Sequence, residues 1–333
     1  MHPGRLRRRV IEVAALLTAL VLVVVLAPGL GEVRHRLTDA DPAWLALAVA
    51  FEALSGCSYV LMFRPIFCPH MAWRTSLEIA WSELAVGSIV PASGAGGLAL
   101  GAWILRRTGA PTDHILRRSV AFFLIKSSVN FLAVAVLGTL MAVGLVGPHR
   151  SPLLTALPAA LAVAVIAVVV AIPRFGPGDD APPEASKLRR AIVAVRRAVV
   201  DGAAEALRIL RSGNVLVIAG AIGYWAWDNA VLWVTFRAVG ASVPLSIVLM
   251  GYLIGQLGGL LPLPGGVGGI DAGLSGMLIV YGAPAAATVA AVLAYRLILF
   301  WLPLLVGGIA LVHLRRALAD PARPDICDPA IAT

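Results

Sequence analysis

Charged residues are scarce in this chain of 333 residues. Only 14% of them are Asp, Glu, Lys or Arg, whereas 59% are hydrophobic and the mean hydropathy is +0.89. Soluble domains carry about 25% charged residues, because their surfaces must be hydrated. The composition therefore excludes a soluble protein. It predicts an all-α, polytopic membrane helix bundle, since helices satisfy their own backbone hydrogen bonds in lipid.

Residues that carry catalysis or ligate metals are also few. The three cysteines, Cys57, Cys68 and Cys327, lack the spacing of metal ligands, and the six histidines are dispersed. No serine or cysteine stands in a nucleophile motif, and neither glycine run ends in the Lys-Ser or Lys-Thr pair of a phosphate-binding loop. We therefore expect no enzyme activity, no metal ion and no cofactor, and we expect the cysteines to be reduced.

The basic residues indicate how the chain is oriented in a membrane. The net charge of +9 comes largely from Lys and Arg in short connecting segments, and no soluble module is large enough to present a basic face to nucleic acid. Cytoplasmic loops are enriched in Lys and Arg. The pattern predicts a multi-pass protein of the cell (plasma) membrane with both termini in the cytoplasm, and no nucleic-acid partner.

Six apolar runs predict membrane spans, and two glycine- and proline-rich stretches interrupt the sequence between them. The runs cover residues 10–26, 42–63, 120–146, 153–172, 214–236 and 285–311. The first run could alternatively be a secretory signal. The interrupting stretches are residues 87–97 (GSIVPASGAGG) and 261–271 (LPLPGGVGGID). Proline removes a backbone donor and glycine weakens a helix, so both stretches predict helix breaks, which lipid tolerates only where they line a polar cavity.

The two stretches match each other at an offset of 171 residues, which indicates an internal repeat. The offset pairs Pro91 with Pro262, Gly94 with Gly265, and Gly97 with Gly268. With the orientation above, the first stretch enters from the cytoplasm and the second from outside, as two re-entrant broken-helix hairpins in an inverted-topology repeat. The alternative is that the glycines only provide close helix packing, which leaves the prolines unexplained.

These features predict one transmembrane domain over residues 1–316. It comprises two N-terminal spans (1–75), a first repeat (76–173), a cytoplasmic linker with a basic amphipathic helix (174–213) and a second repeat (214–316), before a cytoplasmic tail (317–333). Apolar residues recur every three or four positions among the arginines of Lys187–Arg211. This is typical of a helix on an anionic inner leaflet, and the alternative is a solvated connector packed on the bundle.

A binding site is expected where ionisable residues meet the two breaks. A charge at the bilayer centre costs at least about 2.5 kcal/mol, so each one needs a partner or a wet cavity. The candidates are Lys126, Arg296, Asp271, Asp228, Glu83, Pro91, Gly94, Gly97, Pro262, Pro264, Gly265, Gly266, Gly268 and Gly269. Lys126 and Arg296 would hold a lipid phosphate, with helix N-termini adding donors. The alternative is mutual neutralisation, for example of Arg296 by Asp271 or Asp228, and of Lys126 by Glu83.

Residues 261–271, followed by YGAP at 281–284 and AYRL at 294–297, resemble the signature of the lysylphosphatidylglycerol synthase transmembrane-region family, also called flippase-like membrane proteins. The resemblance implies an inverted-repeat helical domain. In longer relatives this domain moves an aminoacylated phospholipid between leaflets after a separate soluble domain has made it. Asp271 stands where the family usually has Glu, and the sequence lacks the soluble synthase domain.

These observations favour a transporter that moves a phospholipid or a polyprenyl-phosphate-type lipid between leaflets through a midplane cavity. Its partners would be membrane lipids, recognised by their phosphate head groups, and inner-leaflet anionic lipids bound at Lys187–Arg211. Two alternatives stay open. The chain could be a non-transporting membrane partner of a separate lipid-modifying or glycosyltransferase enzyme, docked through Lys187–Arg211, or an ion-coupled small-solute carrier.

Overall fold

The regular secondary structure in the described part of the chain is entirely helical. A computed structural model describes residues 11, 12, 15, 18, 30–89, 95–107, 109, 111–176, 186–256 and 269–318. Within these ranges there are helices and no strand, so the predicted all-α class is confirmed. Most of the first predicted span and the tail from 319 lie outside the described residues, as do Pro91, Gly94, Pro262, Pro264, Gly265, Gly266 and Gly268.

Five described helices are long and apolar enough to cross a membrane. They are α3 (Pro42–Phe67), α6 (Thr112–Ala142), α7 (Ala156–Ala171, continued by η1, Ile172–Phe175), α9 (Val215–Ala238) and α12 (Ala285–Leu318). The shorter helices are α2 (Gly31–Thr38), α4 (Trp73–Ile89), α5 (Ala95–Arg107), α8 (Lys187–Arg211), α10 (Leu245–Gly255) and α11 (Gly269–Val280). The chain is therefore a multi-pass membrane protein, and each predicted span from residue 42 onward corresponds to a helix.

Short polar residues mark the points where several helices begin. Asp41 accepts a hydrogen bond from the Ala43 amide at 2.8 Å, ahead of Pro42 in the first turn of α3. Asn214 caps α9 in the same way, and the Ser186 hydroxyl accepts from the amide of Arg189 in α8. These contacts satisfy backbone donors that have no partner inside the helix, so they fix where each helix starts.

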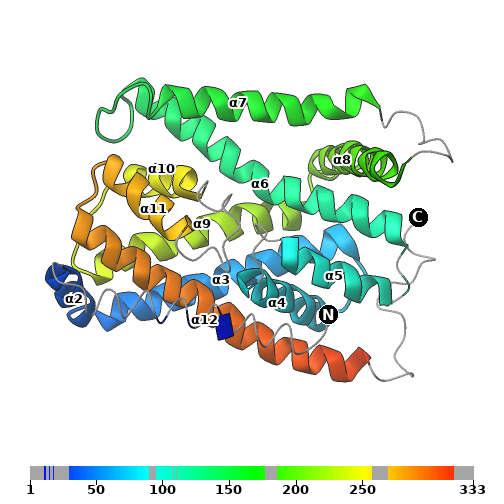
Figure 1. Cartoon of the computed structure of the whole chain (residues 1–333), viewed down its shortest axis with the longest axis horizontal. Coiled ribbons are helices and arrows are strands. Elements are labelled where there is room, and N and C mark those ends of the chain that lie inside the picture. Colours follow the sequence, from blue (N-terminus) through cyan, green and yellow to red (C-terminus); the bar gives the residue numbers. More distant parts are fainter. Residues whose placement is uncertain are drawn as a thin grey trace.

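The long helices run side by side along the long axis of the molecule, and α8 crosses them. In Figure 1, α6, α7 and α12 extend across the view, whereas α8 is seen nearly end-on. The most extensive helix contact joins α3 to α9. Gly220 of α9 permits it, because a Cβ there would lie 2.7 Å from the backbone of α3 at Ser58 and Met62. This central pair positions the rest of the bundle.

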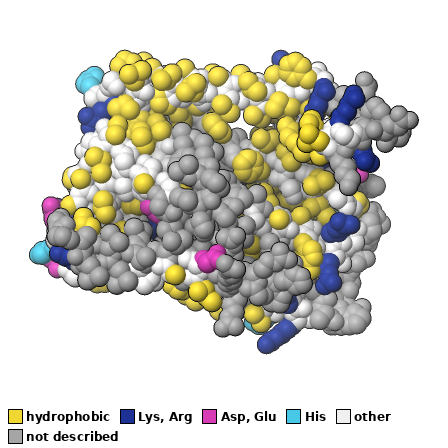
Figure 2. Space-filling view, in the orientation of Figure 1, with side chains coloured by type: hydrophobic (Ala, Val, Ile, Leu, Met, Phe, Trp, Pro, Cys, Tyr) yellow, Lys and Arg dark blue, Asp and Glu magenta, His cyan; other side chains and the backbone are white. Residues whose placement is uncertain are grey.

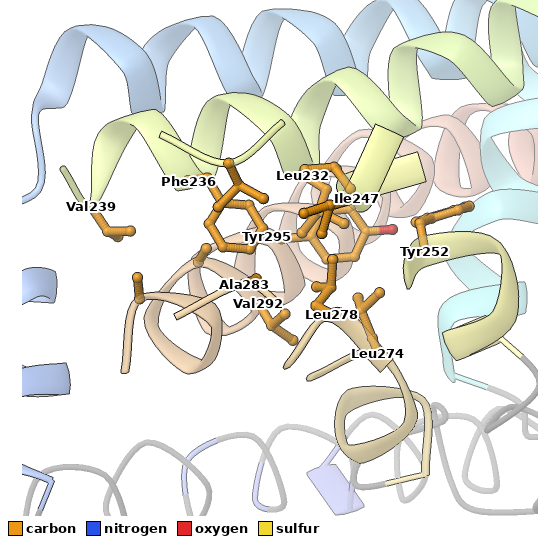
Figure 3. Close-up of a cluster of buried hydrophobic side chains, with 14 of the residues drawn as sticks. Leu232, Phe236, Val239, Ile247, Tyr252, Leu274, Leu278, Ala283, Val292 and Tyr295 are labelled. Carbon is orange, nitrogen blue, oxygen red and sulfur yellow. The ribbon is translucent and has the colours of Figure 1, made fainter. Parts of the chain in front are cut away.

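Two apolar cores lie toward the two ends of this pair. One contains residues of α9, α10, α11 and α12, including Phe236, Leu278 and Tyr295, which Figure 3 shows pointing toward one another. The other contains residues of α3, α4, α5 and α6, including Phe63 and Phe122. Each half of the chain therefore supplies most of one core.

The two short helices that flank each glycine-rich stretch pack against each other, α4 on α5 and α10 on α11. Glycines allow the close approach. A Cβ at Gly97 would collide with the backbone oxygen of Glu83, and a Cβ at Gly255 would lie 2.6 Å from the Leu274 Cα. Since a contact below 3.0 Å cannot be accommodated without a shift of backbone, these glycines serve packing, as the alternative interpretation expects.

The oxidation state of one cysteine differs from the prediction. Cys57 is a free, exposed thiol, whereas Cys68 is disulfide-bonded. The prediction of reduced cysteines is therefore wrong for Cys68, because the spacing of cysteines along a chain does not show which of them meet in the fold.

The hairpin packing can be tested with two glycines of the same helix pair. Gly255→Ala is expected to destabilise the protein by about 1–3 kcal/mol, since the new methyl group meets the backbone of α11. Gly276→Ala is the matched control, because nothing lies within 4 Å of a Cβ there. Thermal melting of the detergent-solubilised variants measures the difference, and equal melting temperatures would contradict the packing described.

Candidate functional site

Five ionisable residues predicted for the site lie together in the interior. They are Glu83 of α4, Lys126 of α6, Asp228 of α9, Asp271 of α11 and Arg296 of α12. Electrostatic interactions join Lys126 to both Glu83 and Asp228, and join Asp228 to Arg296. Gly97 packs against the backbone of Glu83, and Gly269 is the buried first residue of α11. The fold therefore brings the predicted residues of both halves into one network.

Lys126 has no ion-pair partner among the described residues. Its ammonium group lies above the rings of Tyr59 and Tyr224, 5.9 and 5.6 Å from their centroids. The ion pair with Glu83 that the sequence suggested as an alternative is not formed within the described residues. Instead, the Glu83 carboxylate accepts a 2.8 Å hydrogen bond from the Tyr59 hydroxyl. Cation–π contacts leave the donors of an ammonium group free, so Lys126 can still bind an anion.

Arg296 differs from Lys126 because it is already paired. Its Nε lies 2.8 Å from Oδ1 of Asp271, in the first turn of α11. The partial positive charge at a helix N-terminus stabilises a carboxylate there. Asp228 lies nearby and accepts hydrogen bonds from the hydroxyls of Tyr295, at 2.9 Å, and Tyr252. The neutralisation of Arg296 by Asp271 that the sequence suggested as an alternative is present.

The same hydrogen bond occurs once in each half of the chain. Tyr59 of α3 donates to Glu83 of α4, and Tyr252 of α10 donates to Asp228 of α9. Both pairs are 24 residues apart, and an offset of 169 carries Tyr59 onto Asp228 and Glu83 onto Tyr252. That offset is close to the 171 of the glycine-rich stretches, so the donor and the acceptor have exchanged places between the halves. The tyrosines were not predicted, because the offset pairs a tyrosine with an acid in both cases and is recognised only once the hydrogen bonds are known.

Several buried polar atoms around this network have no hydrogen-bond partner among the described residues. They include Oε1 of Glu83, Oδ1 of Asn130, Nε1 of Trp225 and Oδ1 of Asn229. Asn130 follows Lys126 by one turn of α6, and Asn229 follows Asp228 directly on α9. An unsatisfied buried polar atom costs about 1–3 kcal/mol, so a polar ligand or a water molecule that forms hydrogen bonds with these atoms would be bound favourably.

A second polar cluster attaches α8 to α6. Glu205 of α8, which is buried, forms ion pairs with Arg118 at 3.1 Å and Arg117 at 3.8 Å, and a further one with Arg208. The C-terminal half of α8 therefore packs on the bundle. Its N-terminal half does not, because Leu188 and Ile192 are 71% and 59% exposed. The packed alternative therefore describes the C-terminal half of α8, and the contact of the N-terminal half with an anionic leaflet stays a prediction.

The fold and its buried charged network define a polytopic membrane protein with a polar interior. The chain belongs to the family described as "Lysylphosphatidylglycerol synthase TM region", whose profile matches residues 11–307. This confirms the family that the glycine-rich motifs indicated. It also places the protein in a family related to membrane phospholipid biology.

The curated relatives found for this chain are membrane proteins of similar length. A UPF0104 membrane protein of Methanothermobacter thermautotrophicus is 24% identical over 335 residues, which cover 93% of this chain and 96% of the relative. Another UPF0104 membrane protein of that organism is 26% identical over 345 residues, covering 93% and 94%. A third match is 30% identical over 105 residues, or 31% of each chain.

The ion pair between Arg296 and Asp271 can be tested with a double-mutant cycle. Arg296→Leu and Asp271→Leu are each expected to destabilise the protein by about 3–5 kcal/mol, because each removes a charged partner from a buried ionic group. The double variant is expected to be more stable than the sum of the single losses predicts. Thermal melting in detergent checks this, and strictly additive losses would show that the two residues act independently.

Proposed function

We propose that this protein moves a membrane lipid with an anionic, phosphate-bearing head group between the two leaflets. The observation that carries the proposal is Lys126, a cation in the bundle interior with no ion-pair partner among the described residues. A charge kept in such a place at a cost of about 2.5 kcal/mol or more marks a functional site. The family's relation to phospholipid biology supports a lipid as the ligand.

Lys126 receives the phosphate first in this proposal, and Arg296 binds it second. Lys126 has free donors, whereas Arg296 must exchange its contact with Asp271 for the phosphate. The polar atoms left without partners at Asn130 and Asn229 lie beside Lys126 and Asp228 in the sequence, and they offer acceptors to head-group hydroxyl or amino groups. Asp228 and Asp271 then balance the charge of Arg296 or meet a cationic substituent of the lipid.

The arrangement of the short helices supports two re-entrant hairpins as the moving parts. Figure 1 shows α4 and α5 toward one end of the long helices, and α10 and α11 toward the other. Hairpins that enter from opposite sides of the membrane are expected in an inverted repeat. The tyrosine–carboxylate hydrogen bond found in each half also supports it, since each bond joins the helix before a hairpin to the hairpin's first helix.

The distribution of charge supports the proposed orientation. In Figure 2, Lys and Arg side chains gather at the end of the molecule that carries α8. We assign this end to the cytoplasmic side of the plasma membrane. The axis of α8 then lies along the membrane surface, with Leu188 and Ile192 directed at lipid and arginines available to anionic head groups.

Lipid translocation tests the proposed function directly. Protein reconstituted into vesicles with fluorescent phosphatidylglycerol in one leaflet is expected to transfer it to the other. Lys126→Met should slow the transfer by about tenfold or more, as loss of a charged contact worth 1.5–3 kcal/mol predicts. The rate is read by dithionite quenching of the exposed label.

Arg237→Met is the matched control for this variant. Arg237 also lies over an aromatic ring, 5.1 Å from the centroid of Trp233, but outside the network. Transfer by Lys126→Met at the wild-type rate would reject Lys126 as the phosphate site. A folded wild-type protein that moves no lipid would reject the transporter and favour a non-transporting partner of a lipid-modifying enzyme.

The membrane contact of α8 is tested by photo-crosslinking. A photoreactive amino acid at Ile192 is expected to capture phospholipid in nanodiscs that contain anionic lipid, because this position belongs to the exposed apolar side of the helix. Ala194 is exposed on the opposite side of the same turns and is expected to capture little. Mass spectrometry identifies the adducts, and equal capture at both positions would argue against an interfacial helix.

A further inference from the structure

Acidic groups outnumber cations in the buried network. Four carboxyl groups, those of Glu52, Glu83, Asp228 and Asp271, are buried in the described bundle, where the cations of the network are Lys126 and Arg296. This excess is specific to the network. The other buried glutamates, Glu78 and Glu205, have arginines of their own, Arg74 at 3.3 Å and Arg118 at 3.1 Å.

Glu52 is the carboxyl group without compensation. It lies on α3, is 7% exposed, and forms no hydrogen bond or ion pair within the described residues. Its charged neighbour is another acid, since Glu52 and Asp228 of α9 interact electrostatically. Two carboxylates that share an apolar site cannot both be ionised at reasonable cost unless a cation lies between them.

The groups around this acidic pair come from each helix that packs on it. Tyr224 of α9 and Tyr295 of α12 interact with both carboxyl groups, and Tyr252 of α10 donates to Asp228. From α12, Arg296 reaches Asp228, but its ion pair is with Asp271. From α6, Lys126 interacts electrostatically with Asp228 and Glu83, and Glu83 also accepts a hydrogen bond from Tyr59. Lys126 therefore links the proposed phosphate site to the acidic pair.

We propose that the Glu52–Asp228 pair binds a proton that crosses the membrane together with the lipid anion. This inference rests on the proposed function. A phosphate bound to Lys126 weakens the attraction between that cation and Asp228, and it adds negative charge beside the pair. Protonation of the Glu52–Asp228 pair therefore becomes more favourable, and the proton comes from water on the side that the lipid leaves. Release of the lipid to the other leaflet restores the attraction, and the proton leaves to water there.

A proton fits the pair better than a metal cation does. Among the described residues, no group of three or more His, Cys, Asp or Glu side chains could hold a metal ion. Tyrosine hydroxyls donate hydrogen bonds to both carboxylate oxygens of Asp228, so a metal ion would have to compete with these donors, whereas a proton can bind at Glu52 without displacing them. One proton for each singly charged lipid makes the transfer electroneutral, which spares the bundle interior a net charge.

The test uses vesicles that hold a pH dye, fluorescent phosphatidylglycerol and the full-length protein, with valinomycin and potassium to clamp the membrane potential. A gradient of one pH unit is expected to shift the equilibrium ratio of the labelled lipid between leaflets about tenfold, since one proton per lipid contributes 1.36 kcal/mol per pH unit. The pH inside the vesicles should change as lipid moves. Glu52→Gln should abolish both effects while lipid still exchanges between leaflets.

Two further variants keep the result interpretable. Glu52→Asp retains a carboxyl group and should keep the dependence on the pH gradient. Glu78→Gln alters a buried glutamate outside the network and should keep that dependence too. If the ratio of labelled lipid between the leaflets is the same with and without a pH gradient, or if it follows a sodium gradient instead, proton coupling is overturned while lipid transport stands. A wild-type protein that moves no lipid would overturn both.

Discussion

The constraint on which this structure depends is that a charge inside an apolar bundle must be compensated. Most charged groups of the described interior are compensated by an ion pair or by hydrogen bonds. Arg296 pairs with Asp271, Glu83 accepts a hydrogen bond from Tyr59, and Asp228 accepts two from tyrosines. Lys126 and Glu52 do not meet this constraint with an ion pair among the described residues. The two exceptions are of opposite sign, and both interact with Asp228, so the uncompensated charges are organised around one carboxyl group.

Glycine allows the helices to pack tightly around buried charged groups. Close helix packing and buried carboxyl groups both need space in the interior, and glycine has no side chain to fill that space. Gly220 brings α9 against α3, and Gly255 brings α10 against α11. Gly101 of α5 has the same effect at the site, since a Cβ there would occupy the position of the Glu83 carboxyl group. The glycines therefore do more than tolerate a helix break. They also leave the space in which buried carboxyl groups fit.

Sequence reasoning recovered the fold class, five of the spans and the family, because hydropathy and the glycine-rich motifs are local signals. It predicted an apolar span over residues 120–146, whereas the helix there, α6, covers Thr112–Ala142. Polar first turns such as Asp113 and Arg117 continue a helix beyond the apolar segment, and hydropathy cannot detect them. It named five ionisable residues that do meet in the interior. It missed Tyr59, Tyr252 and Tyr295, and it left open whether Lys126 pairs with Glu83. Tertiary packing decides whether a tyrosine or a lysine becomes the partner of that carboxyl group.

Helix α6 carries residues of both the buried charged network and the cluster around Glu205. Arg117 and Arg118 hold α8 through Glu205, and Lys126 lies eight residues after Arg118, or about 12 Å along the same helix. A helix transmits displacement along its axis, since its backbone hydrogen bonds are continuous. The apolar stripe of α8 is covered by α6 in one half and exposed in the other. In the proposed orientation the exposed half meets the inner leaflet, so the helix that would contact lipid is attached to the same element, α6, that carries Lys126.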